Sequence, residues 1–433
     1  MSVNRRQLVL GGLATAATMG LAACSGAAGA TKTGAAASSA AENATLNMAW
    51  WGNDVRNKNT NNMIAAYQTA HPGVKITGAA GEFASYWDKL STQVAGGNAP
   101  DIIQMDMAYI ADYGTKGALL DLRGLDTSKF VEGTVDAGKI KGKLVGINAG
   151  INCLTLFADP KVFEKAGMQV PDDKTWTWDS IVATGAELAS KAGTPFGIAG
   201  LWSDTLFQGW LRQTGKELFT ETGPGFDASD VQTWFDYLVK AQKAGAIGSP
   251  AQIVEEQGQV LGKSAIATGR AGVGLFNSNQ ATALYAAAGQ TLPILRYPTI
   301  SGNAKDRKAW YKASMLWSAS SKTKNPTAAL AVIDYLVNST EAGLVQLAER
   351  GIPANADVQA AVTPKLTAGD LAAQKFLADI KPELSDTPIA PPPGAGQSGT
   401  IMFRYLTDVL YGRQSSADAA SKFLNELKGV IKA

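Results

Sequence analysis

The chain has 433 residues, 45% of them hydrophobic, and carries a formal net charge of +2 from 39 basic and 37 acidic residues. A chain of this length can bury a large core and is expected to form two or more domains. Its near-zero net charge does not favour nucleic acid as a partner. The sequence has 1 histidine and 2 cysteines, which argues against His-based catalysis and His/Cys zinc sites. We therefore expect no metal and no cofactor.

The N-terminus predicts export from the cytoplasm. A basic start with Arg5 and Arg6 precedes an apolar run from Leu8 to Ala23, the pattern of a secretory signal. The run is shorter than the about 20 apolar residues that a membrane-spanning helix needs. Residues 1–23 are therefore predicted to be a signal peptide. The arginine pair leaves twin-arginine and Sec export both open.

Residues 24–44 consist mostly of Ala, Gly, Ser and Thr. Such a segment cannot bury a core and is predicted to be a flexible tether. If Cys24 is modified, Cys153 has no partner for an intramolecular disulfide, so we expect Cys153 to be a small buried apolar residue.

After the tether, strand and helix patterns alternate. Three short strands are predicted at residues 45–50, 74–77 and 101–105, with amphipathic helices between them. This β-α-β-α-β order predicts a mostly parallel sheet with helices on both faces. Further along, extended segments follow Leu144, helices dominate residues 178–245, and helices close the chain.

Aromatic and hydrogen-bonding side chains follow each of the first three strands. In open α/β sheets, ligands bind beyond the carboxyl ends of the strands, so these side chains are candidates for one wall of a site. The candidates are Trp51, Asn53, Asp54 and Arg56 after the first strand, Glu82 and Trp87 after the second, and Asp106 and Tyr109 after the third.

This mixture of side chains favours a sugar as the ligand. The apolar face of a sugar ring stacks on indole or phenol rings, and planar polar groups bind pairs of hydroxyls. Alternatives remain for some residues. Trp87 lies on an apolar helical stripe and is either core or ligand wall. Arg56 either pairs with Asp54, caps a helix or binds ligand. Trp178 either anchors a helix after the N-cap residue Thr177 or binds ligand.

Motifs for common catalytic sites are missing. Gly262-Lys263-Ser264 resembles the end of a phosphate-binding loop, but Gln257 stands where that loop needs glycine, and no Gly-x-Ser-x-Gly motif is present. We expect no enzyme activity and no catalytic residues. A glycan hydrolase that uses two carboxylates remains the enzyme alternative, because it needs only paired acids.

Several segments resemble a known family by their order and spacing. They are "WWGNDVRN", "YWDKLSTQVAGGNAPDIIQMDMAYIADYGTKGALLDL", "TWTWDSI", "KNPTAALAVIDYLVNSTEAG" and "RGIPAN". Together they resemble the family 1, maltose-binding-protein-like extracellular solute-binding proteins of carbohydrate ABC importers. The tetrapeptide Leu21-Ala22-Ala23-Cys24 resembles a lipobox, which implies lipidation at Cys24.

The resemblance implies a two-lobed α/β fold of the periplasmic-binding-protein type II. Each lobe is expected to be a mostly parallel sheet flanked by helices, with a hinge between the lobes. The implied lobe 1 comprises residues 45–152 and 270–338, and the implied lobe 2 comprises residues 153–269 and 339–433.

The resemblance also implies further ligand contacts and the partners. The further contacts are Trp202 and Trp210 from the second lobe, together with Asn277, Trp317 and Arg350. The implied protein is a monomeric, extracytoplasmic lipoprotein on the outer face of the cell membrane. It would deliver a mono- or oligosaccharide, with an oligosaccharide expected, to ABC transporter permease subunits. The same fold binding a non-sugar solute is the other alternative.

Overall fold

The computed structural model describes residues 43–431. The predicted signal peptide, Cys24 and almost all of the predicted tether lie outside the described residues. The described part of the chain falls within one compact unit, and it is built on two separate sheets of four or five strands. We call the part built on the five-stranded sheet lobe 1 and the part built on the four-stranded sheet lobe 2.

The sheet of lobe 1 has the strand order β2-β1-β3-β13-β6. Its strands are β1 (Ala44–Trp51), β2 (Val74–Gly81), β3 (Ile102–Met105), β6 (Ile147–Asn152) and β13 (Lys312–Ala319). β1 pairs in parallel with both β2 and β3, whereas β13 runs antiparallel to β3 and β6. The predicted β-α-β-α-β start of the chain is therefore confirmed, and the carboxyl ends of β1, β2 and β3 meet at one edge of the sheet.

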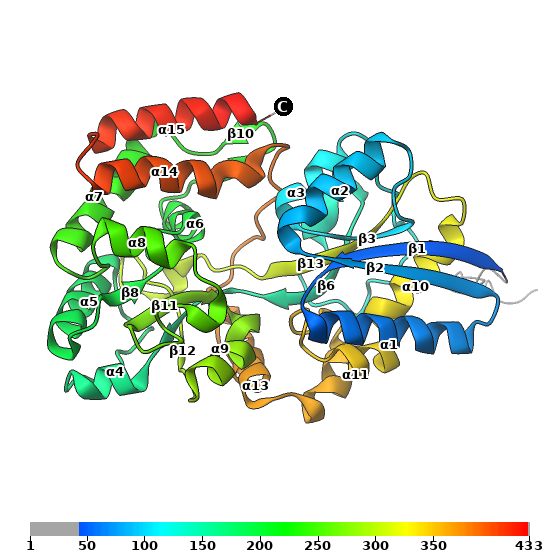
Figure 1. Cartoon of the computed structure of the whole chain (residues 1–433), viewed down its shortest axis with the longest axis horizontal. Coiled ribbons are helices and arrows are strands. Elements are labelled where there is room, and N and C mark those ends of the chain that lie inside the picture. The colour runs from blue at the N-terminus through cyan, green and yellow to red at the C-terminus, as the bar shows by residue number, and fades with distance from the viewer. Residues whose placement is uncertain (1–42, 432–433) are drawn as a thin grey trace, which may run out of the picture. The chain divides into compact units, whose positions relative to one another are not determined.

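Helices cover both faces of this sheet. Figure 1 shows α1, α10 and α11 on one face, and α2 and α3 on the other. They are α1 (Asp54–Ala70), α2 (Phe83–Ala95), α3 (Met107–Gly114), α10 (Pro326–Asn338) and α11 (Thr340–Gln346). Their buried apolar residues form one core with the strands. Each of α1, α2 and α3 begins two or three residues after a strand ends, so its first turn lies at the carboxyl edge of the sheet.

The sheet of lobe 2 has the strand order β12-β7-β11-β8. Its strands are β7 (Leu154–Ala158), β8 (Phe196–Ala199), β11 (Ala271–Asn277) and β12 (Ile294–Leu295). Only β11 and β8 pair in parallel, and β7 runs antiparallel to both β11 and β12. The expectation of a mostly parallel sheet is therefore wrong for lobe 2, because β7 runs opposite to the other three strands and pairs with two of them.

Most of the remaining helices surround this second sheet. They are α4 (Pro160–Lys165), α5 (Trp178–Ala192), α6 (Asp204–Gln213), α7 (Ala228–Lys243), α8 (Pro250–Gln257), α9 (Ala281–Ala288), α12 (Ala356–Val362), α13 (Ala368–Asp379), α14 (Ser398–Leu410) and α15 (Ser416–Val430). Two hairpins complete the fold, formed by β4 (Lys139–Ile140) with β5 (Lys143–Leu144) and by β9 (Phe219–Thr220) with β10 (Gly223–Pro224). The main core of lobe 2 includes α14 and α15.

The crossings between the lobes differ from the expected boundaries. The first lies at Cys153, between β6 and β7. The return expected near residue 270 is wrong, because β11 pairs with β7 and β8 in lobe 2. The chain rejoins the first sheet only at β13. After β13 it stays in lobe 1 through α11, whose Ala342 belongs to the lobe 1 core.

Cys153 is free and buried, as predicted. Burial raises the pKa of its thiol to about 12. Within residues 43–431, no single helix is long and apolar enough to span a membrane, and the combined pair α10 and α11 bends by 65° at its junction.

Candidate functional site

The turn after β1 begins with two buried indoles that face opposite sides of the sheet. Trp50 is almost fully buried, and its Nε1–H donates to Asn57 Oδ1 at 2.9 Å. Trp51 is 7% exposed and packs against the aromatic rings of α2. Alternating side-chain direction along a strand explains why the two rings separate.

The rings around Trp51 form a cluster that continues to α3. Its members are Trp51, Phe83, Tyr86, Trp87 and Tyr109, with centroid separations of 4.0–5.9 Å. Trp87 is 8% exposed and Phe83 is 47% exposed. The cluster thus brings three of the predicted site residues together, but mostly as packed rings.

The predicted polar residues at this edge have local partners or face solvent. Asn53 is exposed and caps α1, because its Oδ1 accepts from the Arg56 N–H at 2.9 Å. Asp54 and Glu82 are exposed. Arg56 does not pair with Asp54. Its Nε donates to Glu349 Oε2 at 2.7 Å in a largely buried ion pair.

Arg350 and Trp317 lie inside lobe 1. Both are 0% exposed, and the Arg350 guanidinium stands over the Trp317 ring at 5.0 Å. Burial, with a smaller contribution from the nearby charge of Arg56, lowers the pKa of Arg350 to about 9. Neither side chain reaches the surface of this structure.

The predicted ligand contacts that lie in lobe 2 are also separated from the candidate residues of lobe 1. Trp178 and Trp202 are core residues of lobe 2, and their indole N–H groups donate to Gln213 and Gln257. Trp210 is half-buried and packs against the same core. Asn277 caps a short helical turn together with Gln280. The structure does not bring these four residues together with the lobe 1 candidates.

One predicted residue, Asp106, lines a cavity between the lobes. The cavity has a volume of about 260 Å³. Its polar lining consists of Asp106 from lobe 1, Asp204, Thr205 and Gln208 from lobe 2, Lys312 at the start of β13, and Ser398. Asp106 is held as the N-cap of α3, with Oδ1 accepting from the Ala108 N–H at 2.9 Å. The carboxyl end of β3 thus supplies one wall and the first turn of α6 supplies the opposite wall.

The cavity contains two carboxylates and one ammonium group. Burial raises the pKa of Asp204, while the backbone N–H of Thr205 and the charge of Lys312 act in the opposite direction. Lys312 has no ion pair within 4.0 Å among residues 43–431. Polar groups that the fold leaves unpaired in a cavity can bind a hydroxyl-rich ligand.

An aromatic ring, Trp310, also lines the cavity. The Arg212 guanidinium lies 5.0 Å over the ring, which holds the indole in place. Apolar side chains in the lining include Met107, Leu218, Phe219 and Ile389. The cavity therefore combines a flat ring with acceptors and donors, and most of its residues were not predicted.

The residues that the sequence analysis missed follow a detectable pattern. Asp204, Thr205 and Gln208 are adjacent on one face of α6, at spacings of one and four residues, while Phe207 and Leu211 face the core. The rule for carboxyl ends of strands, applied to β8, would have pointed to this first turn of α6. The tryptophans predicted from this segment are Trp202, which belongs to the core of lobe 2, and Trp210, which packs against that core.

A second cavity adjoins the first. It has a volume of about 510 Å³ and is lined by Tyr109, Lys116, Lys141, Glu221 and Gln397, among others. Gly396 lines both cavities, and a Cβ at this position would lie 3.4 Å from the Ala108 carbonyl oxygen. The two cavities thus meet beside the first turn of α3, where Tyr109 projects.

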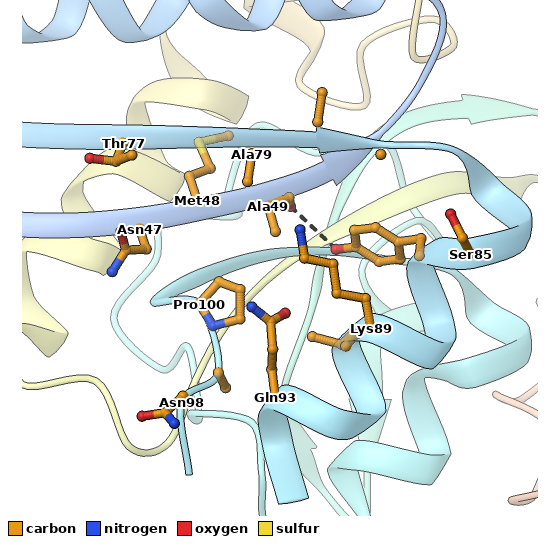
Figure 2. Close-up of a pocket in the computed structure, with 15 residues that line it drawn as sticks. Asn47, Met48, Ala49, Thr77, Ala79, Ser85, Lys89, Gln93, Asn98 and Pro100 are labelled. Atoms are coloured by element: carbon orange, nitrogen blue, oxygen red, sulfur yellow. Dashed lines mark hydrogen bonds between the residues drawn. The ribbon is translucent and has the colours of Figure 1, made fainter. Parts of the chain in front are cut away.

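Figure 2 shows a separate pocket, of about 210 Å³, that belongs to lobe 1 alone. Lys89 and Gln93 of α2 extend toward the strands, where Ala49 and Ala79 stand opposite each other in register and leave space. Its lining comes only from β1, β2, α2 and residues 98–100. Closure of two lobes cannot enclose a ligand there, so the cavity between the lobes is the candidate site.

The arrangement of two lobes around a polar cavity matches a known family. The family model for the bacterial extracellular solute-binding protein matches residues 51–343. The chain belongs to this family. The match runs from the last residue of β1 into α11 and includes Asp106, Asp204, Gln208 and Lys312.

Sequence relatives of this solute-binding protein include sugar-binding proteins. The maltodextrin-binding protein MdxE of Bacillus subtilis (strain 168) is 25% identical over 352 residues, 78% of each chain. The arabinooligosaccharide-binding protein of the same organism is 26% identical over 169 residues, which span 37% of this chain and 39% of that protein.

Solved structures confirm the two-lobed fold. A family 1 extracellular solute-binding protein from Alicyclobacillus acidocaldarius superposes with a TM-score of 0.69 at 26% identity, over 89% of this chain and 98% of the other. A periplasmic oligogalacturonide-binding protein from Yersinia enterocolitica gives a TM-score of 0.77 at 18% identity with the same coverage. At that identity the second likeness concerns the fold alone.

Proposed function

We propose that this protein is the substrate-binding lipoprotein of an ABC importer, and that it captures an oligosaccharide between its lobes and delivers it to the permease. The observation that carries the proposal is the cavity between the lobes, to which Asp106 contributes from one side and Gln208 from the other. A ligand that contacts both walls favours the closed arrangement, because it binds that arrangement more tightly than an open one.

The combined space of the cavity between the lobes and the adjoining cavity supports an oligosaccharide over a single sugar unit. Small-molecule sites usually measure roughly 300–1,000 Å³, and the cavity between the lobes, at about 260 Å³, lies just below that range. The adjoining cavity of about 510 Å³ gives room for further sugar units past Tyr109. The names of the maltodextrin- and arabinooligosaccharide-binding relatives support the same class of ligand.

The anchoring and the lobe boundaries belong to the same proposal. Cys24 would carry lipid, and residues 24–43 would tether the body outside the cell membrane. We assign residues 44–152 and 312–346 to lobe 1, following the sheet and core of that lobe. Residues 154–295 carry all four strands of lobe 2.

A thermal-shift screen of the mature chain against mono- and oligosaccharides tests the proposal. A ligand at 100 times its Kd stabilises the folded state by about 2.7 kcal/mol, so a true ligand raises the Tm. Gln208→Ala should lower this rise by about half, without changing the Tm of the free protein. If no sugar raises the Tm and a non-sugar solute does, the proposed ligand class is wrong.

A second candidate function rests on a specific observation. Asp106 and Asp204 line the same cavity from opposite lobes, and paired carboxylates can cleave glycosidic bonds. Incubation of the mature chain with each stabilising oligosaccharide, followed by chromatography of the products, separates the two functions. An unchanged oligosaccharide supports transport, and fragments that disappear in Asp204→Asn would establish the hydrolase.

A further inference from the structure

Arg350 has an unusual environment for a fully buried cation. It is 0% exposed, and none of the ion pairs of residues 43–431 includes it. Its three donor groups reach neutral side chains instead. Nε donates to Gln104 Oε1 at 2.9 Å, Nη2 to Thr60 Oγ1 at 2.8 Å, and Nη1 to Gln346 Oε1 at 3.4 Å. A buried charge without an acid is costly, so such an arrangement calls for a reason beyond stability.

Each of the three neutral partners also donates a hydrogen bond to a backbone carbonyl. Gln104 Nε2 donates to the Trp51 carbonyl at 3.1 Å. Thr60 Oγ1 donates to the Arg56 carbonyl at 2.7 Å. Gln346 Nε2 donates to the Ala149 carbonyl at 3.2 Å. We call Gln104, Thr60 and Gln346 the relays.

The chemistry of the guanidinium fixes the direction of all three relays. Arginine has only donors, so the oxygen of each relay must face it. The amide N–H groups of Gln104 and Gln346 and the hydroxyl proton of Thr60 are then free to point outward at the carbonyls. Without the guanidinium, the side-chain amides of Gln104 and Gln346 could each rotate by half a turn. The amide oxygen would then face the backbone carbonyl oxygen, and two acceptors cannot form a hydrogen bond.

The three carbonyls lie in two different parts of lobe 1. The Trp51 carbonyl ends β1 and the Arg56 carbonyl lies in the first turn of α1, both at the carboxyl edge of the lobe 1 sheet, and Gln104 itself precedes Asp106 by two residues. The Ala149 carbonyl lies on β6, which crosses to lobe 2 at Cys153. The backbone carbonyl of Arg350 also accepts from Ser314 Oγ on β13, the other crossing strand.

We propose that Arg350 is a positioning residue that holds the ligand-side edge of lobe 1 in register with the crossing strand β6 through the three relays. The contacts exist whether or not the ligand is a sugar, and only the purpose of the coupling, to link occupancy of the cavity to movement of the lobes, rests on the proposed function. Arg350 thereby has a role different from the ligand contact expected from the sequence.

Arg350→Met tests the coupling by hydrogen–deuterium exchange in the ligand-free mature chain. The variant should fold, because its neutral partners leave no opposing charge unpaired. Loss of charge-assisted hydrogen bonds should speed amide exchange by about tenfold or more. We expect faster exchange in residues 51–57 and in residues 149–153 together, with lobe 2 unchanged.

The relays provide matched controls within the same network. Thr60→Val should speed exchange only in residues 51–57, and Gln346→Leu only in residues 149–153. Arg350→Lys has the charge but cannot reach three acceptors in different directions, so it should rescue one segment at most. If Arg350→Met speeds exchange across both lobes equally, or only next to position 350, the coupling does not exist.

A distance measurement tests the link to lobe movement. Nitroxide labels at Lys58→Cys on α1 and Glu255→Cys on α8, in a chain with Cys24→Ser, report the separation of the lobes by pulsed electron paramagnetic resonance. Arg350→Met should broaden the distribution, while Thr60→Val should leave it unchanged. An unchanged distribution in Arg350→Met would overturn the link to movement. No sugar is needed, so this result is independent of the thermal-shift screen.

Discussion

Tyr109 stacks on Trp87 with their ring centroids 4.0 Å apart and their planes inclined by 16°. One face of the Trp87 indole is therefore covered by another residue of the same lobe, and Trp51, Phe83 and Tyr86 surround the rest. Tyr109 lines the cavity of about 510 Å³ beside the candidate site, and Trp87 does not. Both rings line a separate lobe 1 cavity of about 650 Å³, but within this pair only Tyr109 also lines the cavity beside the candidate site, with Trp87 as its support.

Trp87→Ala should destabilise lobe 1. Replacing a buried aromatic residue by alanine typically costs about 3–5 kcal/mol, and we expect about 3 kcal/mol by urea denaturation. Trp87→Phe is the matched control. The Trp87 Nε1–H is buried without a hydrogen-bond partner, so the phenyl ring removes an unsatisfied donor and should cost less than about 1.5 kcal/mol. Equal losses in the two variants would contradict this assignment.

Gln208→Ala should weaken ligand binding by a factor of about ten. The loss of one hydrogen bond to a neutral group costs about 0.5–1.5 kcal/mol, and the Gln208 side chain makes no other hydrogen bond with residues 43–431. Calorimetric titration with a sugar from the thermal-shift screen measures the change. Gln93→Ala is the control, since Gln93 lines only the lobe 1 pocket, and it should leave the Kd unchanged. A tenfold effect of both variants would place the ligand elsewhere.

The first half of lobe 1 could be predicted closely from the sequence. Alternation in residues 45–50 and the helical spacing of Met63, Ile64 and Tyr67 report local structure directly, and β1 and α1 follow them. The position of Asp106 also followed from a local rule, because the residue after a parallel strand lies at the ligand edge. Local patterns were enough wherever consecutive elements are neighbours in space.

The remainder depends on partners distant in sequence. β11 and β13 both have strong strand patterns, and nothing within either one indicates that β11 pairs with β7 and β13 with β3. The resemblance predicts Arg350 as a ligand contact, whereas its donors face Gln104 and Thr60, 246 and 290 residues away. The position of a tryptophan is hard to predict for a related reason. A Trp beside polar residues can still bury its ring, as Trp202 does while its indole N–H donates to Gln257.

The Arg56–Glu349 ion pair should contribute measurably to stability. Its N···O distance is 2.7 Å, and the two side chains are 13% and 15% exposed. A double-mutant cycle with Arg56→Ala and Glu349→Ala should give a coupling energy of about 1–2 kcal/mol. The exposed pair Lys191–Glu187 on α5, with side chains about half exposed, should give about 0.5 kcal/mol or less. A similar coupling in both cycles would show that burial does not strengthen the pair.

The stability of the free protein should fall as the pH rises through the titration range of Asp204. Burial raises the pKa of this carboxyl, so the folded state binds its proton more tightly than the unfolded state, in which the pKa is about 3.9. The free energy of unfolding then decreases with pH above that value until the folded carboxyl has ionised. Asp204→Asn removes this decrease, so the variant should match the wild type at pH 3.5 and be more stable at pH 7, as measured by the Tm.

Lys312 supplies the control for the pH experiment. Its charge partly offsets the rise in the pKa of Asp204, so Lys312→Met should raise that pKa further and enlarge the loss of stability between pH 4 and pH 7. The same substitution in the Asp204→Asn background should leave the pH dependence unchanged, because the titrating partner is gone. A pH profile that Lys312→Met alters equally in both backgrounds would show that the relevant proton is not on Asp204.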